Sequence, residues 1–109
     1  MPRPSRYQRA LASYEAALGA THPNTLRSVN NLAELYQAQG RYSEAEPLYQ
    51  RALAGSEAAL GAAHPNTLTS ANNLALLYQA QGRYGEAEPL YQRVLAGYEA
   101  ALGAAHPTR

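Results

Sequence analysis

Cysteine is absent from this 109-residue sequence. Its absence excludes disulfides, thiolate metal sites and thiol redox chemistry. Phenylalanine and tryptophan are absent as well, so nine tyrosines supply all of the aromatic content. A chain without cysteine is typical of the cytoplasm, which is the predicted location, and an extracellular location is the alternative for a protein that forms a fibre.

Long hydrophobic runs and clusters of like charge are also absent. No stretch approaches the 18 apolar residues that a membrane-spanning helix needs, and no apolar segment follows residues 1–4 as in a secretory signal. Every cation is arginine, every anion is glutamate, and the net charge is +1. This balance provides no electrostatic footprint for nucleic acid or for an anionic membrane, and neither is predicted as a partner.

A period of 42 residues organises what is present. Residues 22–63 and 64–105 both begin with His-Pro-Asn-Thr-Leu and differ at six of 42 positions, so 36 are identical. Residues 1–21 resemble the second half of this unit, and residues 106–109 begin it again with His-Pro. The sequence therefore predicts a half repeat at 1–21, whole repeats at 22–63 and 64–105, and a stub at 106–109. Self-similarity of this kind is typical of solenoids.

Each whole repeat is predicted to form two helices. Over residues 24–39, and again over 44–60, apolar side chains recur at steps of three and four, which places them on one side of a helix. Gly40 and Gly61 are predicted to end these helices, and Ser43 is predicted to cap the start of the second. A single hairpin cannot cover both apolar stripes, so neighbouring hairpins are expected to stack. The predicted fold class is all-α, a right-handed α-solenoid of about five helices.

Small and bulky residues follow a fixed order in four segments of the unit, Asn31-Leu32-Ala33-Glu34-Leu35-Tyr36, Gln39-Gly40-Arg41-Tyr42, Glu44-Ala45-Glu46 and Tyr49-Gln50-Arg51-Ala52-Leu53. This order resembles the tetratricopeptide repeat (TPR). The usual period of that family is 34 residues, and the longer period here is similar to the repeats of kinesin light chain. The resemblance implies TPR-like helical hairpins and a non-catalytic scaffold that binds a protein or peptide.

The resemblance also implies a peptide-binding surface on the first helix of each repeat, opposite the apolar stripe. An asparagine amide both donates and accepts hydrogen bonds, so it can pair with a peptide backbone. In the alternative interpretation these asparagines bond to neighbouring repeats or to solvent. The predicted peptide-binding residues are Arg27, Asn30, Asn31 and Glu34 in the first whole repeat, and Thr69, Asn72, Asn73 and Leu76 in the second.

No catalytic residue, metal site or cofactor is predicted. Glu44 and Glu46, like Glu86 and Glu88, lie two positions apart, and residues with that spacing point to different sides of a helix. They are therefore unsuited to act as paired catalytic carboxylates. No nucleophile elbow or phosphate-binding loop is present in the sequence.

The histidines and tyrosines are interpreted as structural. The histidines lie one repeat apart, about 10 Å in a stacked array, which is too far for one metal ion. They are expected to cap or pack at helix starts; they are His22, His64 and His106. Four tyrosines recur at core positions of the hairpin, so they are expected in the core rather than on a base-stacking surface; they are Tyr36, Tyr49, Tyr78 and Tyr91.

The ends of the array suggest a second function. Solenoids normally have polar capping units, and none is visible here. The chain is expected to begin on a helix over residues 5–18 and to stop on an equivalent one over 86–102, leaving apolar surfaces that are complementary head to tail. Such surfaces build open filaments. Self-assembly into a fibre is therefore the alternative prediction, with self-association residues Tyr7, Leu11, Tyr14, Tyr91, Leu95 and Tyr98.

Overall fold

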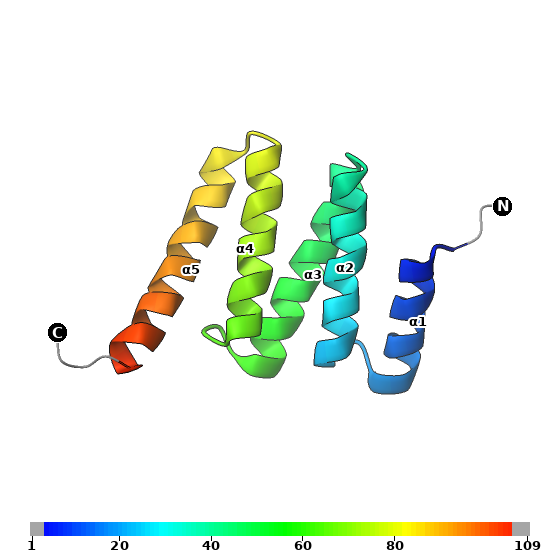
Figure 1. The fold of residues 1–109 in the computed structure, drawn as a ribbon, viewed down its shortest axis with the longest axis horizontal. Helices are drawn as coiled ribbons and strands as arrows, with labels where there is room; N and C mark the ends of the chain where they lie inside the picture. The colour runs from blue at the N-terminus through cyan, green and yellow to red at the C-terminus, as the bar shows by residue number, and fades with distance from the viewer. Residues whose placement is uncertain (1–3, 106–109) are drawn as a thin grey trace.

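The helices of the chain lie side by side in chain order, as Figure 1 shows. The computed structural model describes residues 4–105, and over this range it contains five helices and no strand. Extensive packing joins only helices that are consecutive in the chain. The predicted all-α solenoid of TPR-like hairpins is confirmed. The helices are α1 (Arg6–Leu18), α2 (Pro23–Ala38), α3 (Tyr42–Leu60), α4 (Pro65–Ala80) and α5 (Tyr84–Ala105).

The helices are of two types, which alternate along the chain. We call α2 and α4 first-type helices, because each begins a repeat directly after a histidine, and α1, α3 and α5 second-type helices. His22 and His64 cap the first-type helices, and their Nδ1 atoms accept hydrogen bonds from the backbone N–H groups of Asn24 (3.1 Å) and Asn66 (3.0 Å). The predicted capping role is confirmed for both, whereas His106 lies outside the described residues.

The predicted cap of the second helix is wrong. Helix α3 begins at Tyr42, with Arg41 in the N-cap position, and Ser43 lies inside the first turn with no capping bond. The first turn is held instead by Arg41, whose Nε donates to Glu44 Oε1 at 2.9 Å and keeps the pKa of that carboxyl below its usual value. Gly40 (φ 75°) makes the preceding turn with a backbone that favours glycine, as predicted.

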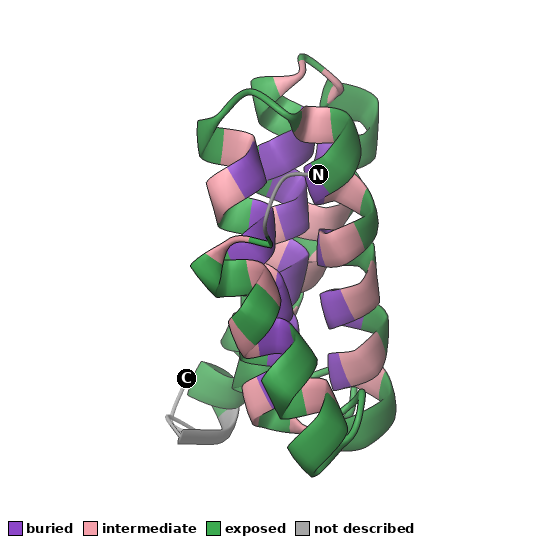
Figure 2. Cartoon of the chain, turned by 90° about the vertical axis from the view of Figure 1, so that its right-hand side faces the viewer, coloured by how far each residue is buried: buried purple, intermediate pink, exposed green. Residues whose placement is uncertain are grey.

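Small residues and tyrosines together fill the core between the helices, where Figure 2 shows the buried positions gathered. The small residues allow the helices to approach closely, and the tyrosine rings fill the wider gaps. Tyr36, Tyr49 and Tyr78 are buried and Tyr91 is half-buried, so the core interpretation of these tyrosines is confirmed. The most completely buried apolar residues are Val29, Ala33, Ala45, Ala52, Ala71, Ala75 and Leu77.

Ion pairs repeat between successive second-type helices. Arg51 of α3 pairs with Glu15 of α1 at 2.6 Å, and one repeat later Arg93 of α5 pairs with Glu57 of α3 at 2.7 Å. These pairs are about one third exposed, so each contributes little to stability. Their value lies in fixing the same register between successive repeats.

Candidate binding surface

The eight predicted peptide-binding residues all lie on the accessible side of α2 and α4. Their exposure follows from the helical period, because the apolar stripe of each helix faces α3 or α5 and leaves these positions outside. The exposed side chains are Arg27, Asn31, Glu34, Thr69 and Leu76, and the half-buried side chains are Asn30, Asn72 and Asn73.

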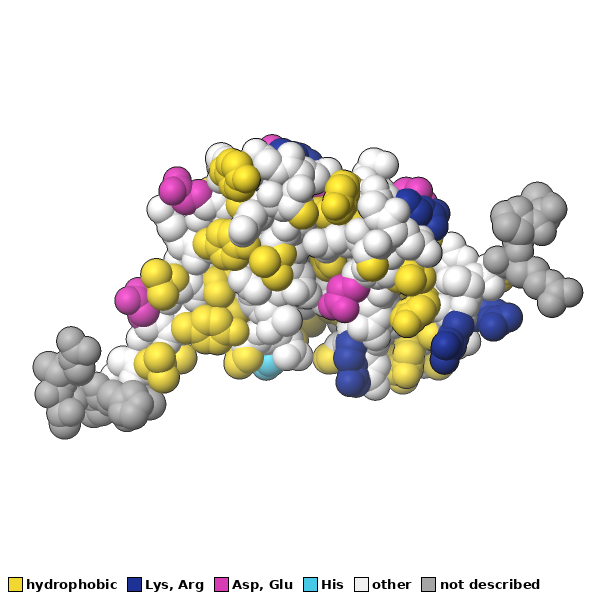
Figure 3. All heavy atoms as spheres, turned by 45° about the horizontal axis from the view of Figure 1, so that its top comes forward, with side chains coloured by type: hydrophobic (Ala, Val, Ile, Leu, Met, Phe, Trp, Pro, Cys, Tyr) yellow, Lys and Arg dark blue, Asp and Glu magenta, His cyan; other side chains and the backbone are white. Residues whose placement is uncertain are grey.

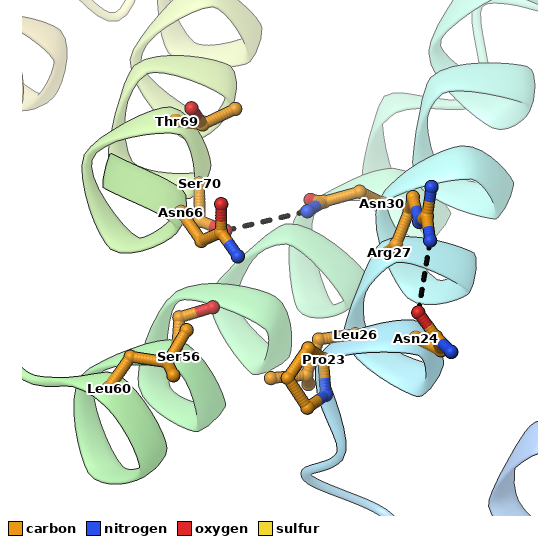
Figure 4. Close-up of a pocket in the computed structure, with 10 residues that line it drawn as sticks. All are labelled: Pro23, Asn24, Leu26, Arg27, Asn30, Ser56, Leu60, Asn66, Thr69 and Ser70. Carbon is orange, nitrogen blue, oxygen red and sulfur yellow. Dashed lines mark hydrogen bonds between the residues drawn. The ribbon is translucent and has the colours of Figure 1, made fainter. Parts of the chain in front are cut away.

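A depression of about 450 Å³ lies between the first turns of α2 and α4 and the end of α3 (Figure 4). The structure brings Arg27, Asn30 and Thr69 together in its walls. Asn30 Nδ2 donates to Ser70 Oγ at 3.4 Å, so this asparagine bonds the neighbouring repeat, as the alternative interpretation expected. The Oδ1 atom of Asn30 is buried and has no partner within residues 4–105.

The floor of this depression includes a residue that the sequence interpretation missed. Ser56 of α3 is buried and lines it, whereas the equivalent position one repeat later is Tyr98. The small side chain leaves room between α2 and α4 that a tyrosine would fill. The change of size at this position was the available signal, because only six positions differ between the two whole repeats.

Two further depressions adjoin the same surface. One lies between α1 and α2 and is lined by Asn31, Tyr7 and Tyr14; the other brings together Glu34, Asn73 and Leu76. Asn72 lines neither of them, nor the depression at Ser56. Seven of the eight predicted residues are therefore distributed over three depressions, and Asn72 lines none of them.

The predicted self-association residues separate into three environments. The expectation that Leu11 lies on an exposed end face is wrong, because Leu11 is only 7% exposed and belongs to the core, where α1 covers α2. Tyr7 and Tyr14 lie on the same side of α1 as Leu11, at the depression between α1 and α2, and remain 39% and 40% exposed. At the opposite end Leu95 and Tyr98 are exposed and Tyr91 is half-buried, and Figure 3 shows hydrophobic side chains gathered over the C-terminal end of the molecule.

Tyr49 lines the depression that contains Glu34, Asn73 and Leu76, and the pKa of its hydroxyl is perturbed. Burial, together with the nearby charge of Glu34, raises the pKa of Tyr49 to about 12. Its hydroxyl donates to Gln37 Oε1 at 2.8 Å, a bond that the phenolate would lose. Tyr49 therefore keeps its proton in the folded chain under conditions in which an exposed tyrosine ionises.

Raising the pH from about 10 to about 12 is expected to destabilise the fold through Tyr49, because the unfolded chain releases this proton near pH 10. The contribution is fully present below pH 10 and amounts to about 2–3 kcal/mol, lost as the pH rises through the folded pKa. Urea unfolding followed by circular dichroism at several alkaline pH values measures it. Tyr49→Phe should make the pH dependence shallower, and an equally steep dependence in that variant would contradict the assignment.

Within residues 4–105, no three histidine or glutamate side chains converge as a metal ion would require. Over the same part of the chain, no helix is both long and apolar enough to cross a membrane.

The profile of the tetratricopeptide repeat family matches residues 5–58 and 28–100. A crystal structure of nearly identical TPR-like repeats, from a candidate kinesin light chain of Podosopora anserina, is similar with a TM-score of 0.79 and 35% sequence identity. The similarity covers 86% of this chain and 44% of that chain. No curated protein matches the sequence.

Proposed function

Because this chain belongs to the tetratricopeptide repeat family, we propose that it is a non-catalytic scaffold that binds a protein or peptide on the surface of α2 and α4. One observation carries the proposal: three depressions lie along this surface, and polar side chains line them. Within the described residues the side-chain amides of Asn31 and Asn73 make no hydrogen bond, so both remain available to a peptide backbone.

Replacing both of these asparagines is expected to weaken peptide binding by about tenfold or more, since each neutral hydrogen bond contributes roughly 1 kcal/mol. The probe is a peptide selected against the full chain from a displayed random library, and its affinity for each variant is measured by fluorescence anisotropy. Asn72→Ala is the matched control, because Asn72 lies on the same surface but lines none of the depressions. Equal affinity for Asn31→Ala/Asn73→Ala and for the unaltered chain would reject this surface as the binding site.

Self-assembly into head-to-tail filaments is the second candidate function. The exposure of Leu95, Tyr98 and Leu102 on α5 favours it, because the equivalent side chains of α3 are more covered. Apolar faces at an end of a solenoid drive association when a complementary face exists. Light scattering over a concentration series, with negative-stain microscopy, tests it. Long particles with a regular axial repeat support assembly, and a constant mass of 11.7 kDa rejects it.

A further inference from the structure

The contact between the two whole repeats centres on one carboxylate. Glu46 of α3 accepts a hydrogen bond from Arg83 Nη1 at 2.7 Å and another from the Tyr78 hydroxyl at 3.2 Å. The guanidinium of Arg83 lies over the Tyr78 ring, 4.4 Å from its centroid. Arg83, Tyr78 and Glu46 thus form one three-residue cluster, and the preceding repeat supplies its glutamate.

At the α1 end, the arginine and the tyrosine of an equivalent cluster are present without the glutamate. Arg41 lies over the Tyr36 ring at 4.2 Å, in the arrangement of Arg83 and Tyr78. The position equivalent to Glu46 is Pro4, which precedes α1. Among the described residues, Arg41 therefore bonds only within its own turn, to Gln39 and Glu44. A depression lined by Arg41, Tyr36, Leu35 and the residues just before α1 marks the unfilled place.

At the α5 end, the glutamate of an equivalent cluster is present without its arginine and tyrosine. Glu88 is the equivalent of Glu46 one repeat later, and it is exposed and in no ion pair within residues 4–105. The exposed apolar side chains Tyr84 and Leu95 line the same depression as Glu88. In α3 the counterpart of Leu95 is covered where α4 packs. The internal repeat therefore defines what fits this face, which is a first-type helix followed by a turn that carries an arginine.

We propose that a second copy of this chain supplies that helix, with α5 of one copy lying on α2 of the next in the place that α1 occupies. This inference rests on the self-assembly proposed above. Helix α5 carries counterparts of three α1 residues that contact α2, α3 or the core, and it adds Glu88 for Arg41 and Tyr36. The counterparts are Gln92 for Gln8, which donates to the Tyr36 hydroxyl, Leu95 for Leu11, and Glu99 for Glu15, the partner of Arg51.

Replacing α1 by α5 of a second copy favours association because it buries more apolar surface, in addition to pairing charges. It exposes Leu11, but it covers Leu95 and Tyr84. Helix α1 leaves on the short linker that follows its C-cap, Gly19, a residue with φ of 95°. Because α1 is tethered, it competes at an effective concentration on the order of millimolar, so association is expected to depend steeply on protein concentration. The contact is head to tail and leaves both ends open, which generates filaments.

The test follows the mass of the full chain by sedimentation and light scattering over a concentration series. Glu88→Ala is expected to raise the concentration needed for association by about tenfold, as loss of a charged hydrogen bond predicts. Arg41→Ala should do the same, and the double variant should be no worse than either single variant, because both remove one contact. Glu46→Ala is the matched control: the same residue one repeat earlier should lower the unfolding midpoint and leave association unchanged.

A second measurement follows α1 directly. Amide hydrogen exchange in α1 should become faster as the chain associates, because α5 of the second copy displaces α1 from α2. Amides of α5 should become better protected. Association that is unchanged by Glu88→Ala and Arg41→Ala, or that slows amide exchange in α1, overturns this arrangement. Self-assembly itself would not be contradicted by that result. A monomer at every concentration overturns both. Coupled effects of the two variants together with faster exchange in α1 support the proposal.

Discussion

Leu53→Glu is expected to unfold the chain, whereas Leu95→Glu is expected to leave the stability of the monomer almost unchanged. The two leucines occupy the same position of successive repeats, yet Leu53 is 8% exposed and Leu95 is 59% exposed. A carboxylate at Leu53 would be buried without a partner while the burial of the leucine is lost. The combined cost is about 4 kcal/mol or more, comparable to the whole stability of a small domain.

Chemical denaturation followed by circular dichroism, at a protein concentration where the chain is monomeric, measures both variants. Leu53→Ala provides an intermediate case, with an expected loss of about 2–4 kcal/mol, because it removes the packing without burying a charge. If Leu53→Glu and Leu95→Glu shifted the unfolding midpoint equally, the stacking of α4 on α3 described above would be wrong.

Leu77→Ala is expected to cost about 3–4 kcal/mol, and Leu35→Ala about 1–2 kcal/mol. Leu77 is fully buried in the core, whereas its equivalent Leu35 is only partly buried. The difference arises because α1 begins later in the repeat than α3 does. Helix α3 begins at Tyr42, whereas α1 begins at Arg6, which is the equivalent of Leu48. The shorter α1 therefore covers less of the end of α2. Thermal unfolding of the two variants gives the comparison, and a larger loss for Leu35→Ala would contradict the packing at α1.

The sequence alone determined the fold because the determining signals are local and repeat. The period of 42 residues, the steps of three and four between apolar residues, and the histidines before Pro23 and Pro65 each act within a few residues of the chain. Helix types, their order and the capping by His22 and His64 follow from such signals. The placement of the first-type helical surface outside the core follows from the same period.

The tertiary structure decided which equivalent residues are covered. Leu11, Leu53 and Leu95 have the same local sequence signal, but the first two are buried and the third is exposed, since burial depends on whether a neighbouring helix is present. Asn30 and Asn31 are adjacent and identical in type, yet only Asn30 reaches Ser70 of the next repeat. Contacts between helices of successive repeats join residues about 40 positions apart. The sequence pattern within one helix therefore does not predict which of its faces is covered by another helix.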